Sequence, residues 1–295
     1  MDGDIIQIEN LVKVDDPFAV LDEVKTIIVM IFPEFDFELL DGIFKDILRL
    51  FRGDFPGYRK CNTKYHDLKH TTDTFLTQAS LIHGASICGH GFSERIINLG
   101  LACALFHDTG YIQKTDDLSG TGAKYTLIHI SRSIEFMDSY LNENGYFKEE
   151  DLSDGKDILR CTGLNTRLED IHFRSDRIEM MGKILGTADL MGQMADRRYL
   201  EKLLFLFHEF REGGVGGFET ELDLLNDTVH FNKITKERFA RELGGANRFM
   251  LFHFQQRWNI DSDIYAEAID RKIAHLKTIL KDHREDYRLY LRRGW

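Results

Sequence analysis

The chain has 295 residues, of which 43% are hydrophobic and 29% are charged, so it can bury a sizeable core. This composition excludes disordered, collagen-like and fibrous proteins. Acidic residues outnumber basic ones by 49 to 38, the net charge is −11, and no Lys/Arg-rich block is present. We therefore expect no stable complex with nucleic acid.

The first residues lack the positive charge and apolar run of a signal peptide, and no segment is apolar enough to be a transmembrane helix. Four widely spaced cysteines form no Cys-x-x-Cys pair, which predicts reduced thiols that lie mostly in the core. Together these features indicate a cytoplasmic protein without a membrane partner. The cysteines are Cys61, Cys88, Cys103 and Cys161.

Helical periodicity dominates the chain. All three prolines fall within the first 56 residues, which leaves the remainder free to form long helices. Apolar residues recur at intervals of three and four, and alternation typical of strands is scarce. The sequence therefore predicts an all-α fold. The apolar stripes cover residues 37–51, 127–141, 199–210, 249–258 and 264–280.

Breaks between helices are expected where glycine and polar residues cluster, at 52–63, 115–123, 142–155 and 213–217. None of them resembles a long linker between independent domains. We therefore expect an N-terminal helical cap over residues 1–58 and a main domain over 59–295, packed as one compact unit.

The first segment with ligand-type residues is 65–73, which reads YHDLKHTTD. If this segment is helical, His66 and His70 lie one turn apart on the same face. A helical His-x-x-x-His pair is a frequent metal-binding arrangement, although it also arises by chance.

Two further segments place charged groups in apolar surroundings. Residues 99–110 read LGLACALFHDTG, so an apolar helix runs into His107 and Asp108. Residues 185–192 read LGTADLMG and contain Asp189. Burying such groups costs free energy unless they are paired, and each aspartate has a simpler alternative role as a helix cap. A divalent cation would stabilise all of these groups together.

The combination of His-x-x-x-His, His-Asp and a later Ala-Asp-Leu resembles the HD superfamily of metal-dependent phosphohydrolases. Residues 65–73 are especially similar to the cyclic-nucleotide phosphodiesterase branch, which reads Tyr-His-Asn-x-x-His-x-x-Asp there, with Asp67 replacing the usual asparagine. The resemblance covers roughly residues 60–280 and implies an HD-domain/PDEase-like helical bundle.

The resemblance implies that His70, His107, Asp108 and Asp189 bind one divalent cation (Mn²⁺, Fe²⁺, Zn²⁺ or Mg²⁺). It makes His66 the general acid that protonates the leaving alkoxide. It also makes Asp108 a catalytic residue, which bridges to a second metal in dinuclear members of the family.

The chain departs from the family at two places. Tyr111 stands where the phosphodiesterase branch has a third histidine, so a second metal site is uncertain, and His129 is a candidate replacement ligand or phosphate contact. Phe249 is a candidate aromatic clamp on the substrate, although an aromatic stripe of this kind is more often part of the core, and residues 246–247 contain no base-reading glutamine. We therefore do not expect a dedicated cyclic-purine phosphodiesterase.

The function expected from the sequence is metal-dependent hydrolysis of a phosphodiester or nucleotide phosphoester, in which a metal-activated water attacks phosphorus. The partner is a small phosphorylated, nucleotide-like substrate. A nucleotide phosphomonoesterase of the same fold and a non-catalytic metal- or nucleotide-binding sensor are the alternatives. Substrate, native metal and oligomeric state stay open at this stage.

Overall fold

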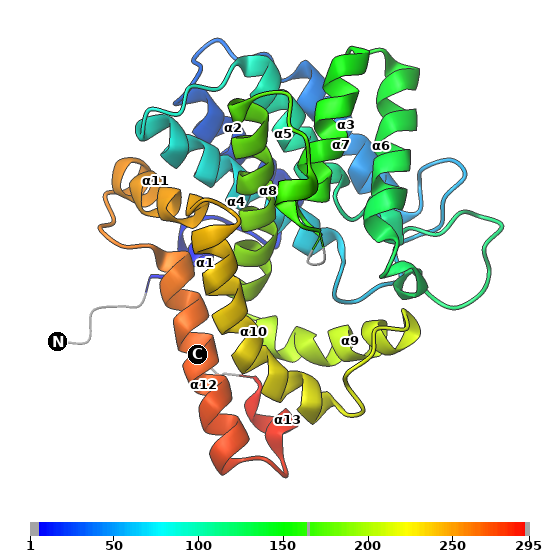
Figure 1. Cartoon of the computed structure of the whole chain (residues 1–295), viewed down its shortest axis with the longest axis vertical. Helices are drawn as coiled ribbons and strands as arrows, with labels where there is room; N and C mark the ends of the chain where they lie inside the picture. The colour runs from blue at the N-terminus through cyan, green and yellow to red at the C-terminus, as the bar shows by residue number, and fades with distance from the viewer. Residues whose placement is uncertain (1–5, 164–165, 293–295) are drawn as a thin grey trace.

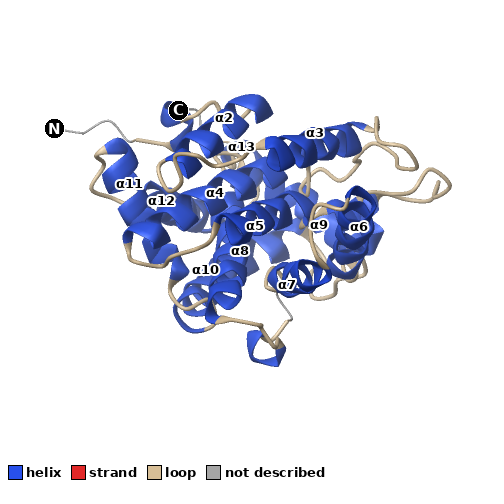
Figure 2. Cartoon of the chain, turned by 90° about the horizontal axis from the view of Figure 1, so that it is seen from above, coloured by secondary structure: helices blue, strands red, loops and turns tan. Residues whose placement is uncertain are grey.

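The described chain consists of α-helices joined by turns. The computed structural model describes residues 6–163 and 166–292. Within this part of the chain there is no β-strand, only one isolated antiparallel bridge between Tyr58 and Lys114, and Figure 2 accordingly shows helices and loops alone. The all-α prediction is confirmed. In chain order the helices are α1 (Ile8–Leu11), α2 (Pro17–Val29), α3 (Glu38–Arg52), α4 (Leu68–Ile87), α5 (Glu94–Phe106), α6 (His129–Asn144), α7 (Glu149–Arg160), α8 (Asp176–Ala195), α9 (Tyr199–Glu212), α10 (Glu221–Arg241), α11 (Phe249–Trp258), α12 (Ile264–Asp282) and α13 (Tyr287–Tyr290), with short 3₁₀ turns at Thr109–Tyr111, Gly122–Tyr125, Leu168–Asp170 and Ala246–Arg248.

Each predicted apolar stripe corresponds to one helix. The stripe 249–258 coincides with α11, and 264–280 ends two residues before α12 does. Helix α3 buries the apolar face that its periodicity predicts and ends at Gly53, whose φ of 86° is readily adopted by glycine.

The predicted break at 142–155 is too long. Helix α6 continues to Asn144, and α7 already begins at Glu149. The acidic residues at the start of α7 favour a helix N-terminus. Gly155, which suggested a loop, lies inside α7, where an added Cβ would come within 3.0 Å of the Met137 side chain. This glycine permits close helix packing and does not end the helix.

Helices α4 and α8 pack against each other at the centre of the molecule, with α2, α3 and α5 on one side and α9, α10 and α12 on the other (Figure 1). Every residue from 70 to 85 of α4 is buried. The two helices approach closely because Gly192 in α8 has no side chain, and an added Cβ would lie 3.1 Å from the Thr77 hydroxyl.

The apolar core is continuous across the expected boundary at residue 58. It extends from Val12 to Leu291, and the Phe44 ring of α3 lies 5.8 Å from the Phe75 ring of α4. The N-terminal helices therefore share their core with the helices that carry the ligand-type residues.

The four cysteines form no disulfide. Cys103 and Cys161 are buried, whereas Cys61 is half-buried and Cys88 is exposed, so the expectation of core thiols is met at two of the four positions. Among the described residues, no helix has the length and apolar character needed to cross a membrane.

Candidate metal centre

Helix α4 brings His70 into the core. Its N-cap is Asp67, whose carboxylate accepts a hydrogen bond from the His70 amide at 2.9 Å. His66 precedes the cap, so the expectation that His66 and His70 share a helical face is wrong. The two rings are nevertheless close, with centroids 5.9 Å apart. Asp67 thus acts as the N-cap of α4, because its carboxylate accepts a hydrogen bond from a backbone amide of the first turn.

His107 and Asp108 lie just beyond the C-terminal end of α5. His107 Nδ1 donates to the Ala104 carbonyl at 2.8 Å, which leaves Nε2 as the ring nitrogen with a lone pair. The Ser133 hydroxyl of α6 donates to the His107 carbonyl at 2.6 Å and accepts from the Gly110 amide at 2.9 Å. The turn that carries both ligand-type residues is therefore fixed against α6.

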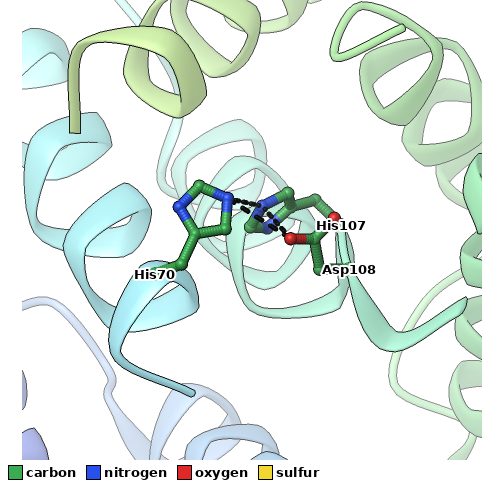
Figure 3. Close-up of side chains that lie close together, drawn as sticks. All are labelled: His70, His107 and Asp108. Atoms are coloured by element: carbon green, nitrogen blue, oxygen red, sulfur yellow. Dashed lines mark hydrogen bonds and ion pairs between the residues drawn. The ribbon is translucent and has the colours of Figure 1, made fainter. Parts of the chain in front are cut away.

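Three buried side chains meet at this point. His70, His107 and Asp108 each present one donor atom, and these atoms lie within 4.8 Å of one another (Figure 3). The two Nε2 atoms are 3.2 Å apart, and each is 3.3 Å from Asp108 Oδ2. The group can hold a metal ion.

Asp189 of α8 approaches the same imidazoles. It is not part of the three-residue group, but its Oδ1 lies 3.1 Å from His70 Nε2 and 3.8 Å from His107 Nε2. Helix packing thus brings together all four residues that the sequence proposes as ligands, from three separate segments.

The spacing and the hydrogen bonding both suit a cation. Donors held at about 2.1 Å from a metal are about 3.0 Å apart at neighbouring octahedral positions and about 3.4 Å apart in a tetrahedron. Asp108 Oδ2 is buried, yet it accepts no hydrogen bond from the described residues. A buried carboxylate oxygen without a donor is costly, and a metal ion would satisfy it.

The electrostatics of the group favour positive charge. Burial alone lowers the pKa of both imidazoles, but Asp108 and Asp189 outweigh it and raise the pKa of His70 to about 10 and that of His107 above its usual value. Burial raises the pKa of Asp108, but His107 and His70 hold it well below its usual range. Two ionised carboxylates beside two imidazoles attract a divalent cation.

His66 is oriented by a residue that the sequence did not reveal. Its Nδ1 donates to Glu209 Oε2 at 2.7 Å, and Glu209 Oε1 accepts from the backbone amides of Lys64 and Tyr65 at 2.6 and 2.7 Å. Burial raises the pKa of Glu209, but His66 and these amides lower it below its usual value. The only sequence signal is an acidic residue within the aromatic-rich stripe that became α9.

Tyr111, the residue in the place of a third histidine, lies between two imidazoles. Its ring stacks on His66 at 4.3 Å and on His129 at 4.7 Å between centroids. His129 Nδ1 donates to the Thr126 carbonyl at 2.6 Å, and His129 Nε2 lies 3.9 Å from Asp108 Oδ1. Burial lowers the pKa of His129, so this imidazole favours its neutral, ligand-competent form.

Phe249 is not brought to this group. It is fully buried at the start of α11, and its carbonyl lies against Gly84, fourteen residues along α4 from His70. At 1.5 Å per residue that separation is about 21 Å. The side chain fills the core, and its position offers no support for a substrate clamp.

A family model described as Npun_R2479-like matches residues 55–242. The matched segment begins before His66 and extends beyond Glu209, so it contains the whole group, whereas α11 lies outside it. No curated protein and no solved structure matches the chain.

Proposed function

This chain belongs to the Npun_R2479-like family, and we propose that it is an HD-type metal-dependent phosphohydrolase. In this proposal the described helices form an HD-domain/PDEase-like bundle. The substrate is a phosphodiester or a nucleotide phosphoester, and the protein works in the cytoplasm.

The observation that carries the proposal is the convergence of His70, His107, Asp108 and Asp189. They come from three distant segments, and five of their donor–donor distances are 3.1–3.8 Å. A His–Asp pair that merely capped a helix would not need a second histidine and a second aspartate at the same point. Two imidazoles and two carboxylates suit Mn²⁺, Fe²⁺ or Zn²⁺, and also Mg²⁺ with more water ligands.

When bound, the cation would lower the pKa of a water molecule and neutralise negative charge on the phosphoryl oxygens. The protein residues supply the proton for the leaving group. His66 donates its Nδ1 hydrogen to Glu209, so Nε2 is the nitrogen that carries the transferable proton. Glu209 holds the ring in place through this contact.

The pairing of His66 with Glu209 favours an enzyme over a non-catalytic sensor. A binding module needs no oriented acid, whereas a buried carboxylate that fixes one ring nitrogen is the usual support for general acid–base catalysis. Glu209 is 6% exposed. Its burial would cost free energy without a partner of this kind.

The site favours a small substrate. The net charge of −11 disfavours a polyanion, whereas one or two phosphate groups can be held by a local cation. A nucleotide monophosphate fits this description as well as a diester does, so both classes belong in the test.

Turnover of an aryl phosphodiester and of nucleoside monophosphates with added Mn²⁺ tests the proposal. We expect hydrolysis that EDTA abolishes and that His107→Ala reduces to background. Cys88→Ser, which changes an exposed thiol away from the group, is the matched control and should retain full activity. Activity that survives both EDTA and His107→Ala would contradict the proposal.

A further inference from the structure

We propose that Gln193 is a positioning residue that holds the Asp189 carboxylate toward the two imidazoles, and that Tyr65 fixes the orientation of its amide. This inference rests on the metal site of the proposed function. It adds two residues that have no ligand-type side chain and that lie outside the donor group itself.

The contacts form a chain from Tyr65 to Asp189. The Tyr65 hydroxyl lies 2.5 Å from Gln193 Oε1. Gln193 Nε2 lies 3.1 Å from the Asp189 carbonyl oxygen and 3.3 Å from Asp189 Oδ1. Gln193 follows Asp189 by one turn of α8, so both of its contacts with Asp189 come from regular helical spacing.

Only one orientation of the amide satisfies all of these atoms. An ionised carboxylate and a backbone carbonyl accept hydrogen bonds and cannot donate them, so the –NH₂ end of Gln193 must face Asp189. The amide oxygen then faces Tyr65, whose hydroxyl can donate. The reverse orientation would bring the amide oxygen against two acceptors.

The Gln193 amide donates to the same Asp189 oxygen that approaches the imidazoles. Asp189 Oδ1, which accepts from Gln193, is the same atom that lies 3.1 Å from His70 Nε2. A donor on this oxygen limits rotation of the carboxylate and leaves its second lone pair directed elsewhere. The Asp189 side chain is 13% exposed and lacks the enclosure that Asp108 has, so it gains more from being held.

Tyr65 links Gln193 to the segment that carries His66. It is 3% exposed and immediately precedes His66, and its backbone amide is held by Glu209. Two adjacent residues therefore have two roles in the proposed site. His66 supplies the proton, and Tyr65 supports the proposed ligand Asp189 through Gln193. Partners of this kind contribute about 10- to 100-fold to metal affinity in other proteins.

The test is the Mn²⁺ affinity of the full-length protein, measured by titration calorimetry without substrate. Gln193→Met keeps the side-chain volume but removes the amide, and we expect its dissociation constant to rise about 10- to 100-fold. Tyr65→Phe should cause a smaller rise. The double variant should bind no more weakly than Gln193→Met, because the hydroxyl acts only through the amide.

Thr228→Val is the matched control, since it removes a buried hydroxyl from α10 that, among the described residues, donates to the Leu224 carbonyl alone. Its Mn²⁺ affinity should equal that of the wild type, while its thermal stability in EDTA should fall as far as that of Gln193→Met. If Thr228→Val lost as much Mn²⁺ affinity as Gln193→Met, the effect of Gln193→Met would be explained by general loss of stability. That result would overturn the proposal.

Unchanged affinity in Gln193→Met, or in Tyr65→Phe if Gln193→Met fails to fold, also overturns the inference. Asp189→Ala identifies which statement has failed, because it must weaken Mn²⁺ binding if Asp189 is a ligand. The proposed function fails separately, when wild-type protein binds Mn²⁺ but hydrolyses no phosphoester.

Discussion

At the scale of single residues, three of the four site histidines have Nδ1 committed to a protein acceptor, whereas the buried Nδ1 of His70 has no hydrogen-bond partner among the described residues. His107 and His129 each donate Nδ1 to the carbonyl of the residue three positions earlier, and His66 donates Nδ1 to Glu209. Each Nε2 is therefore the ring nitrogen that the fold leaves to act on a ligand, because Nδ1 carries a hydrogen that is already donated. The orientation of these three rings is set by contacts within the protein, and no bound ligand is needed to form them.

The role of His66 can be tested by changing the leaving group. His66→Ala should retain Mn²⁺ affinity but lose about 10²- to 10⁴-fold in kcat on an alkyl phosphodiester. The loss should be much smaller on a nitrophenyl diester, because a good leaving group departs without a proton. Glu209→Gln should show the same leaving-group dependence with a smaller loss.

The comparison of kcat across a series of leaving groups provides the measurement. Equal losses for nitrophenyl and alkyl substrates would contradict the acid role, and so would a His66→Ala protein that no longer binds Mn²⁺. The second result would make His66 a ligand.

At the scale of helices, the position of α4 depends on small residues at its contacts. Gly84→Ala would place a Cβ 1.9 Å from the Phe249 carbonyl oxygen of α11. Because a backbone atom cannot move aside cheaply, we expect a loss of about 1–3 kcal/mol in the free energy of unfolding. Gly42→Ala in α3 is the matched control, since within the described part of the chain its Cβ would meet only the Tyr146 hydroxyl, at 3.8 Å.

Gly42→Ala should leave stability unchanged or raise it by up to about 1 kcal/mol, because alanine is the better helix former. Urea unfolding of both variants gives the comparison. Equal changes in the free energy of unfolding for Gly84→Ala and Gly42→Ala would contradict the close packing of α4 against α11.

The contact between α4 and α11 also contains a buried histidine pair. His83 Nδ1 and His253 Nδ1 are 3.1 Å apart, and the Glu23–Arg257 ion pair lies nearby. Burial and the Arg257 charge lower the pKa of His83 to about 4. Burial, then His83 and Arg257, lowers the pKa of His253 to about 3.

This pair predicts a loss of stability in acid. Both folded-state pKa values lie below the unfolded value of about 6.5, so between pH 6.5 and 4 the unfolded chain binds protons that the folded chain does not. Stability is therefore unaffected above pH 6.5 and falls with decreasing pH, by at most about 1.4 kcal/mol per unit for each histidine.

The double variant His83→Leu/His253→Leu should show a shallower dependence of the unfolding free energy on pH between 6.5 and 4. The exposed His230→Ala is the control and should keep the wild-type slope. All proteins are compared in EDTA, so the metal group contributes equally to each. An unchanged slope in the double variant would contradict the prediction.

Helix positions could be predicted because they depend on local pattern. The stripe at 249–258 gave both ends of α11, since apolar periodicity and the following Asn259, which adopts φ of 54°, are local properties. Gly155 misled the prediction because its reason is a neighbouring helix, and glycine in a sequence does not distinguish a turn from a close contact.

In the candidate site, too, some residues could be predicted from local sequence and others could not. Its proposed ligands were recognisable as charged groups in apolar segments, which is a property of each segment alone. Glu209 was missed, since its partner His66 lies far away in the sequence and only packing brings the two together. Gln193 contacts Asp189 through helical spacing, but its second partner, Tyr65, is distant in the sequence. For Phe249 the local aromatic pattern fitted both a clamp and a core residue, and the fold places its side chain in the core.

At the scale of the whole molecule, the bundle joins one polar centre to a large apolar core. Phe249 is buried, and no glutamine is present at residues 246–247, so neither an aromatic clamp nor a base-reading amide comes from this part of the chain. Under the proposed function, selectivity between bases would then rest on shape and on stacking by other parts of the chain, which are worth about 1–3 kcal/mol.

We therefore expect a preference of less than about a hundredfold between purine bases. Values of kcat/KM for cyclic AMP, cyclic GMP, nucleoside monophosphates and a simple aryl diester give the measurement. A preference for one cyclic nucleotide far beyond this range would show that another residue reads the base.

The central claim is that three helical segments hold one divalent cation. A crystal of the wild-type protein soaked in Mn²⁺ and measured by anomalous scattering tests it most directly. We expect one strong peak about 2.0–2.4 Å from His70 Nε2, His107 Nε2 and a carboxylate oxygen of Asp108 and of Asp189. A map with no peak at this group, or with its strongest peak elsewhere, would contradict the account.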